Sequence, residues 1–427
     1  MTSTKLIALV GGAMAATAFA AAQAQDRPNQ SEFFQRDRYE AIQDRYQEAF
    51  DPEPVRLGSL IVNSDLRLGV EADDNVFADE ANEESDVIFR IAPTVDVRSN
   101  LSRHAFGARA QVEHREYSDL GSESATNLRG ELRGRLDVTR AFDVGATIFA
   151  TDEVEERRNV ANLDIFEEPV SFQTAGLRAN ARFTRDRVRL RGDYEVTDYT
   201  YDDVPLVGGG SFSNSDRDYQ FQRFRARAAY AMTPDLAVFV QGEANQRAYD
   251  ELSPVDGGLA SRDADGVAAQ IGVNFELPVL VRGDLAIGYL EDDKDDEVFA
   301  DVDGLSLEAS LQWFPTRLTT VSFDASRRVI DPGLATSGSA TAQDFGVRVD
   351  HELYRNVLLF GELGVRDRDY EDINRDDELL DARLGATYKL NKRLHLDGYY
   401  ERFDRDSSNP NANFEQNVFG LALRIFP

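Results

Sequence analysis

The sequence predicts an all-β fold, a single transmembrane antiparallel β-barrel of eighteen strands. Three observations predict it: a secretory signal at the N-terminus, an alternation of apolar and polar residues with a period of two, and a regular alternation of short turns with long loops. Together they indicate a chain that leaves the cytosol and crosses a membrane with strands.

The first 24 residues have the pattern of a secretory signal peptide. Lys5 supplies a positive charge, the run from Leu6 to Ala22 is apolar and uncharged, and Ala22-Gln23-Ala24 is a small-residue cleavage pattern. A transmembrane anchor is the alternative, but Ala and Gly dominate the run and the cleavage pattern follows at once. We therefore expect cleavage near Ala24 and localisation in an outer membrane of the Gram-negative type.

The composition excludes several functional classes. The chain has no Cys, which rules out disulfides, Cys-based zinc sites and thiol nucleophiles. It carries 77 acidic and 47 basic residues, and this excess of acid disfavours a nucleic-acid partner. No segment after the signal offers an apolar run of about twenty residues, so no transmembrane helix is expected.

Residues 25–56 differ from the rest and form a predicted periplasmic segment with a short helix. Phe34, Ile42, Tyr46 and Phe50 recur at near-helical spacing, and Asp51-Pro52-Glu53-Pro54 ends the pattern. An extension without fixed contacts is the favoured interpretation. A docking helix or a partial plug of the barrel is the alternative.

From 57 to 427 the period changes to two, which predicts one barrel domain. In residues 128–138, leucines, glycines and a valine share one face, while arginines and acidic residues share the other. Residues 188–196 and 267–275 repeat the pattern. Strict alternation over nine or more residues is typical of long strands with one apolar face.

The connections between these strands alternate in length. Short turns are predicted near 100, 140, 185, 233, 278, 315, 355 and 391, and longer acidic or Gly/Ser-rich loops near 78, 121, 160, 209, 257, 297, 336, 374 and 408. Seventeen connections give eighteen strands, and sixteen is the alternative count. Short periplasmic turns opposite long extracellular loops are typical of outer-membrane barrels, whereas β-sandwiches lack this rule.

Aromatic residues gather near the expected strand ends, which favours two interfacial belts facing lipid. The tyrosines near the long loops are Tyr117, Tyr199, Tyr201, Tyr249 and Tyr370. The aromatics near the short turns are Phe142, Tyr230, Trp313, Phe314, Tyr354 and Tyr388.

The layout resembles the putative beta-barrel porin 2 family of outer-membrane proteins. The resemblance rests on the entry segment from Arg56 to Leu60, the strand from Leu66 to Val70, and Asp73-Asp74-Asn75-Val76-Phe77 after it, and it covers 57–427. The last strand also resembles a barrel assembly signal, although Pro427 stands where an aromatic residue is usual. The resemblance implies a pore associated with export of capsular or extracellular polysaccharide.

No catalytic or metal site is expected, and no cofactor. The four histidines, at 104, 114, 351 and 395, do not occur at metal-ligand spacing, and no nucleophile elbow is present. We therefore expect a protein that is not an enzyme.

One inner wall of the predicted barrel is rich in arginine. If the apolar faces meet lipid, four strands point ten arginines into the lumen. They are Arg129, Arg133, Arg135, Arg178, Arg182, Arg189, Arg191, Arg223, Arg225 and Arg227. Such a wall either guides an anionic solute or forms cross-strand pairs that stiffen the barrel.

Three functions compete at this point. A pore for export of polysaccharide has as partners an anionic polymer, periplasmic export components and outer-membrane lipid. A general diffusion porin for small solutes is the second, and a loop folded into the lumen would favour it. A structural or surface-binding barrel with a closed lumen is the third.

Overall fold

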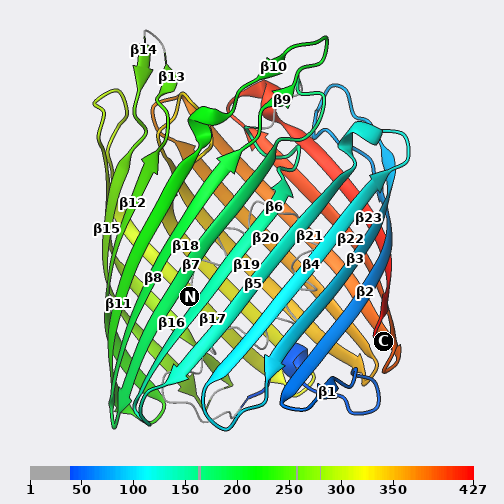
Figure 1. Ribbon diagram of the computed structural model, residues 1–427, viewed down its shortest axis with the longest axis vertical. Coiled ribbons are helices and arrows are strands. Elements are labelled where there is room, and N and C mark those ends of the chain that lie inside the picture. The colour runs from blue at the N-terminus through cyan, green and yellow to red at the C-terminus, as the bar shows by residue number, and fades with distance from the viewer. Residues whose placement is uncertain (1–38, 162–164, 256–257, 279) are drawn as a thin grey trace.

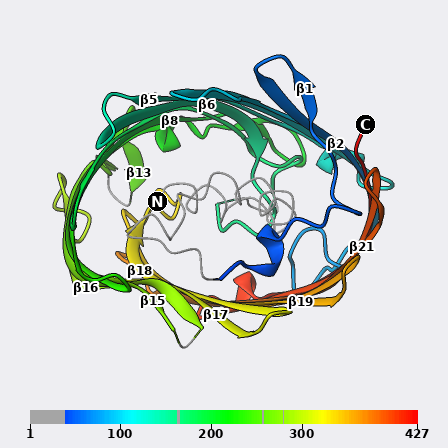
Figure 2. The same ribbon diagram turned by 90° about the horizontal axis from the view of Figure 1, so that it is seen from below.

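Eighteen long strands form one antiparallel sheet that closes on itself (Figures 1 and 2). The computed structural model describes residues 39–161, 165–255, 258–278 and 280–427. The barrel strands are β2 (Leu60–Asp73), β3 (Asp86–Ser99), β4 (Ala105–Tyr117), β5 (Ala125–Asp137), β6 (Phe142–Val154), β7 (Ser171–Arg185), β8 (Val188–Tyr201), β11 (Tyr219–Thr233), β12 (Leu236–Tyr249), β15 (Ala264–Leu277), β16 (Val281–Lys294), β17 (Val302–Thr316), β18 (Thr319–Ile330), β19 (Ala340–Tyr354), β20 (Val357–Tyr370), β21 (Arg375–Asn391), β22 (Leu394–Ser407) and β23 (Phe414–Ile425).

Each barrel strand pairs with its neighbours in the sequence, and β2 pairs with β23 to close the ring. The predicted fold of eighteen strands is therefore confirmed. A short strand, β1 (Val55–Leu57), pairs with β2 where β23 does not reach. The barrel itself thus begins at Leu60, and the segment near Leu57 forms a hairpin that projects at its base (Figure 2).

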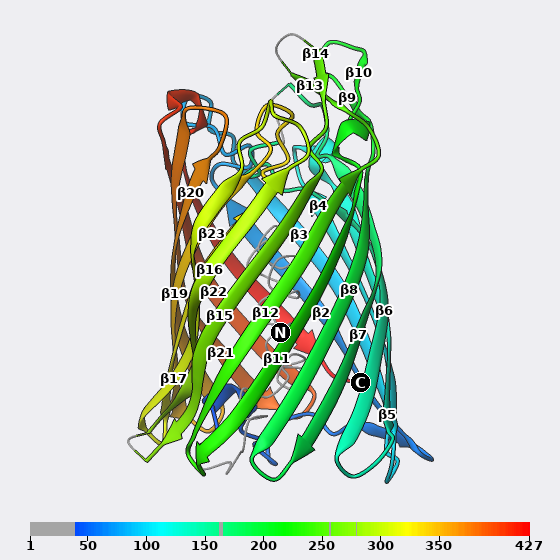
Figure 3. The same cartoon turned by 90° about the vertical axis from the view of Figure 1, so that its left-hand side faces the viewer.

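The two ends of the barrel differ as the sequence indicated (Figure 3). One end, called here the short-turn end, has eight connections as short as 186–187 and no longer than 100–104. The other, the long-loop end, has nine, as long as 202–218. Two of these nine depart from the prediction of long acidic loops: 371–374 is as short as a turn, and 408–413 contains no acidic residue.

The loops contain only short regular elements in the described part of the chain. Two small hairpins, β9 (Val204–Pro205) with β10 (Ser211–Phe212) and β13 (Ser253–Val255) with β14 (Gly258–Ala260), rise above the rim (Figure 1). Three-residue 3₁₀ helices are η2 (Ile42–Asp44), η3 (Gly121–Glu123), η4 (Ser215–Arg217) and η5 (Pro410–Ala412). Among the described residues, no helix is both long and apolar enough to cross a membrane.

Strand alternation separates an apolar outer face from a polar inner face. Ile148, Ile271 and Leu384 are at least 60% exposed on the outside, whereas Glu71 and Glu401 on the inside are at most 5% exposed. Apolar side chains lose nothing by facing lipid, while buried charges need partners. The outer face is therefore the membrane face, and polar side chains line the interior.

The prediction of two lipid-facing aromatic belts is right at one end and wrong at the other. Tyr230, Trp313, Tyr354 and Tyr388 near the short turns are 43% to 66% exposed on the outer face. Phe314, which was predicted for the same belt, is 5% exposed and stacks on Tyr39 inside the barrel. The tyrosines near the long loops point into the barrel instead, where Tyr201, Tyr249 and Tyr370 stack under arginines. Their side chains face inward because strand parity, which the grouping by position ignored, places them on the polar face.

The N-terminal segment lines the short-turn end from inside, over its described residues 39–54. Tyr39 stacks on Phe314, with ring centroids 5.1 Å apart, and Arg45 forms an ion pair of 2.8 Å with Glu352. Ile42 is 3% exposed, and its backbone N–H donates to the Thr320 hydroxyl over 3.0 Å. The favoured interpretation, an extension without fixed contacts, is wrong for these residues. The predicted signal peptide lies outside the described residues.

Candidate functional site

The arginine wall lies where the sequence predicted it, on the inner faces of β5, β7, β8 and β11. Pairing in register places these side chains next to carboxylates of adjacent strands, for example Arg178 and Arg223 on either side of Glu195. At least nine of the ten arginines form ion pairs with a carboxylate, and Arg189 donates to Thr184.

These ion pairs neutralise most of the positive charge of the wall. Arg178 is 3.0 Å from Glu195, Arg182 is 3.0 Å from Asp143, and Arg225 donates to Glu243 over 2.7 Å. Cross-strand pairs of opposite charge stabilise neighbouring strands. The geometry therefore supports a structural role for the wall, because its arginines do not present bare charge to the lumen.

The nine connections of the long-loop end hold the second set of candidate residues. They contain 27 acidic residues and four basic ones, Arg157, Arg158, Arg217 and Arg262. Each of the four is engaged in contacts between elements that are distant in the sequence. Sequence reasoning missed this set, although a lone arginine in a strongly acidic loop was the available signal.

Arg157 and Arg158 fix the loop between β6 and β7. Arg157 pairs with Glu123 over 2.6 Å, and both side chains are at most 4% exposed. The Arg158 guanidinium lies 3.6 Å from the ring centroid of Phe403 on β22, and Arg405 donates to the Arg158 backbone carbonyl.

The position of β22 shows where this loop runs. Between β6 and β22 the barrel wall passes through β5, β4, β3, β2 and β23. Phe403 and Arg405 are buried on the inner face of β22, each 7% exposed. The loop must therefore extend through the interior to reach them.

Arg217 joins the same loop to the loop between β8 and β11. It donates to Glu155 over 2.5 Å and its guanidinium lies 4.0 Å from the ring centroid of Tyr201. Burial disfavours the charged guanidinium, but Glu155 and Tyr201 outweigh this and raise the pKa of Arg217 above its ordinary value. The residue therefore stays charged at any physiological pH.

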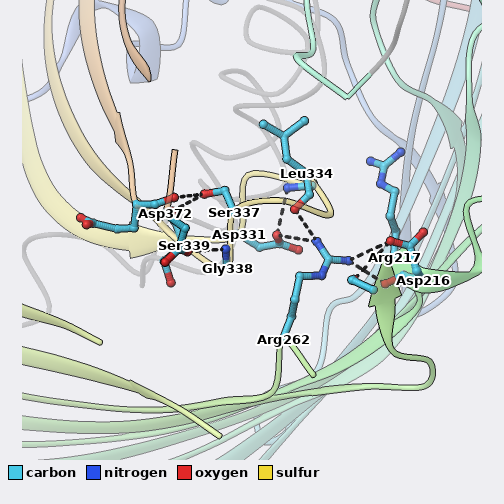
Figure 4. A network of polar contacts seen from close by, with 12 residues as sticks. Asp216, Arg217, Arg262, Asp331, Leu334, Ser337, Gly338, Ser339 and Asp372 are labelled. Atoms are coloured by element: carbon cyan, nitrogen blue, oxygen red, sulfur yellow. Dashed lines mark hydrogen bonds and ion pairs between the residues drawn. The ribbon is translucent and has the colours of Figure 1, made fainter. Parts of the chain in front are cut away.

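Arg262 joins three connections of the long-loop end (Figure 4). Its side chain is fully buried, lies over Tyr249, and donates to the Asp216 carbonyl over 2.6 Å and to the Leu334 carbonyl over 3.1 Å. A carboxylate oxygen of Asp331 lies 3.7 Å away. The loop between β18 and β19, residues 331–339, is thereby held inside the barrel mouth.

The two inward loops meet each other. A Cβ built on Gly333 would lie 3.4 Å from the Cβ of Ala161 and 3.2 Å from a terminal nitrogen of Arg217. The 331–339 loop thus lies next to the loop between β6 and β7, with no room between them for a side chain larger than that of Ala at 333.

No metal centre was found in the described residues, where no group of three His, Asp or Glu side chains is placed to hold an ion. The polar side chains inside the barrel instead bind one another. Gln241 donates to Gln270 over 2.8 Å, and Gln270 donates to Ser306 over 2.8 Å across Gly288. The interior offers hydrogen-bonding groups and paired charges, which suit the passage of a hydrated solute better than covalent chemistry.

A family model described as Putative beta-barrel porin 2 matches residues 48–426, nearly the whole chain. The chain belongs to this family. It is a porin-like β-barrel of the outer membrane, and this class of protein is a channel rather than an enzyme. No curated protein matches the chain.

Several solved barrels are similar to the chain at low sequence identity. A BenF-like porin from Pseudomonas fluorescens Pf-5 is 10% identical with a TM-score of 0.47, covering 86% of this chain and 99% of that one. Pseudomonas aeruginosa OccK2, solved with glucuronate, is 9% identical with a TM-score of 0.45, covering 86% and 98%. The copper transporter OprC is 11% identical with a TM-score of 0.49, covering 88% and 82%.

Proposed function

We propose that the protein is a passive channel for small hydrophilic solutes, with a cross-section limited by loops folded into the barrel. A barrel of this size is wide enough to hold an aqueous channel. The observation that carries the proposal is the contact of Arg158 with Phe403, because it brings the loop between β6 and β7 across the interior. A loop that narrows the lumen favours small solutes over polymers.

Export of an anionic polysaccharide is the second candidate, and the distribution of charge favours it. The eight short turns contain seven basic and two acidic residues, against four basic and 27 acidic residues in the long loops. This gradient would attract an anionic chain at the periplasmic end and repel it from the outer end. Export would require the inward loops to move aside.

Liposome swelling with neutral sugars of increasing size separates the two candidates. For a diffusion channel we expect rapid entry of monosaccharides and a rate that falls steeply with size. Equal passage of long acidic oligosaccharides would favour export instead. Absence of both swelling and planar-bilayer conductance would contradict either kind of channel and leave a closed, structural barrel.

A further inference from the structure

The short turns carry arginines that lack a carboxylate partner among the described residues. The eight connections of the short-turn end contain seven basic residues and two acidic ones. Of the seven, Lys392 pairs with Glu53, and Arg103 donates to the Asp137 carbonyl over 2.9 Å. The other five are exposed, and within the described part of the chain their side chains form no ion pair or hydrogen bond. These five, called here the rim arginines, are Arg140, Arg187, Arg317, Arg355 and Arg393.

Lipid-facing aromatic residues lie beside the rim arginines. Trp313 is 43% exposed on the outer face, and its strand, β17, ends at the turn that contains Arg317. Tyr354 is 66% exposed and directly precedes Arg355. Trp and Tyr gather where the hydrocarbon of a bilayer meets its headgroups. These guanidinium groups are therefore placed at the level of the headgroups.

The same arrangement recurs elsewhere on the ring. The Arg187 carbonyl accepts a hydrogen bond of 2.8 Å from the N–H of Ala231, and the neighbouring Tyr230 is 44% exposed on the outer face. Arg140 lies in the turn between β5 and β6, and at least six strands separate it from the turn with Arg317 in either direction. The rim arginines thus occupy five of the eight short turns and are spread around the base of the barrel (Figure 3).

We propose that the rim arginines bind the anionic headgroups of phospholipids in the leaflet at the short-turn end. A guanidinium donates paired hydrogen bonds to a phosphate, and its aliphatic stem lies along apolar surface while the charged head stays at the interface. Each basic residue close to an anionic membrane surface contributes about a fivefold preference for that surface. The inference concerns the surroundings of the barrel and does not depend on the channel function proposed above.

The distribution of charge favours lipid over a soluble acidic partner. A protein would meet the rim on one side, whereas lipid surrounds the barrel, as the rim arginines do. Carboxylates at this end are engaged inside the ring, where Glu352 pairs with Arg45 and Asp51 pairs with Lys389, so the turns keep a net positive charge. The long loops, with 27 acidic and four basic residues, would repel the same headgroups. The contact is therefore confined to one leaflet.

The single tryptophan of the chain is a probe that lies within the proposed contact. Trp313 precedes Arg317 by four residues in the sequence. The protein would be reconstituted in vesicles of phosphatidylglycerol and phosphatidylcholine, with bromine on the acyl chains of one lipid at a time, because bromine quenches tryptophan fluorescence at short range. We expect anionic phosphatidylglycerol to be enriched about fivefold over phosphatidylcholine next to Trp313. The enrichment should decrease as salt is added, because salt screens the interaction.

Two double variants test whether the arginines cause this enrichment. In Arg317→Gln/Arg355→Gln the two lipids should quench Trp313 almost equally. Arg140→Gln/Arg187→Gln is the matched control, because it removes the same charge from the same rim but from other turns, and it should leave the enrichment at Trp313 unchanged. Heat-dependent gel mobility shows that each variant is folded.

Moving the probe reverses the expected result. In the background Trp313→Phe/Tyr230→Trp the tryptophan lies beside the turn with Arg187. Arg140→Gln/Arg187→Gln should then abolish the enrichment, and Arg317→Gln/Arg355→Gln should leave it unchanged.

Three outcomes would overturn the proposal. Equal quenching of wild-type Trp313 by the two brominated lipids would leave the rim arginines to water or to a soluble acidic partner. An enrichment that survives Arg317→Gln/Arg355→Gln would assign the lipid contact to other groups. An equal loss in both double variants would show a response to net charge instead of local binding. None of these results bears on conductance, so the channel function is tested separately.

Discussion

The arginines of the strands and the arginines of the loops are both held by polar partners, but these partners lie at different distances along the chain. On the wall, Arg182 pairs with Asp143 and Arg225 with Glu243, each on the adjacent strand. In the loops, Arg217 reaches Glu155, 62 residues away, and Arg262 reaches Leu334, 72 residues away. The arginines of the wall bind partners on the adjacent strand, whereas the arginines of the mouth bind partners that are distant in the sequence.

Because of this difference, similar ion pairs have different structural roles in the sheet and in the loops. A pair within the sheet adds to a ladder of backbone hydrogen bonds that would persist without it. A pair between two loops is a principal support of an irregular segment. We therefore expect loss of a loop pair to change the shape of the mouth and loss of a wall pair to change only stability.

The largest effect is expected for Arg217→Met. Arg217 and Glu155 are 6% and 3% exposed, and leaving one partner of a buried pair unpaired costs about 3–5 kcal/mol. Hydrogen exchange of the segments 155–161 and 331–339 should increase strongly. The double variant Arg217→Met/Glu155→Gln should recover part of the protection. Full protection in the single variant Arg217→Met would show that a loop pair supports its segment no more than a wall pair does.

A smaller effect is expected for Arg225→Met on the wall. Its partner Glu243 lies on β12, and the two side chains are 13% and 17% exposed. Loss of this hydrogen-bonded pair should lower the free energy of unfolding by about 1–3 kcal/mol, measured by urea denaturation in vesicles. Single-channel conductance should stay the same, and a marked change in conductance would show that the wall also shapes the solute path.

The strand framework could be predicted from the sequence because its signals are local. Period-two alternation fixes which side chains share a face, so the inward position of Arg189 and Arg191 followed directly. Turn residues set the strand count. The mouth could not be predicted in this way, because Arg158 and Phe403 are brought together by irregular backbone that has no period.

Two features could be predicted only in part. The tyrosines near the long loops were recognised by position, but their direction was missed because parity along each strand was not applied to them. The N-terminal segment shows only imperfect periodicity, and its fixed contacts, such as Arg45 with Glu352, involve strands about 300 residues later in the chain. Both errors concern side chains that face the interior near an end of the barrel.

Ion selectivity tests whether the wall guides anions. Because the wall arginines are engaged by carboxylates and other polar partners and the mouth is acidic, we expect no anion preference in the wild type. The measurement is the zero-current potential across a planar bilayer in a KCl gradient. An anion preference that disappears when Arg189, Arg191, Arg223 and Arg225 are charge-reversed would instead support an anion-guiding wall.

The smallest effect expected is the pH dependence of the contact between Arg262 and Asp331. Burial disfavours the Asp331 carboxylate, but Arg262 and the Gly333 N–H outweigh burial and hold the pKa of Asp331 below its ordinary value of 3.8. A lowered pKa in the folded barrel means that this contact contributes its full stability above the ordinary value and loses it as the pH falls through the lowered one. The free energy of opening of residues 331–339, measured by hydrogen exchange, should therefore stay constant from about pH 7 to pH 5 and fall below about pH 4. Asp331→Asn should remove this acid response, and an identical response in that variant would assign it to another carboxylate.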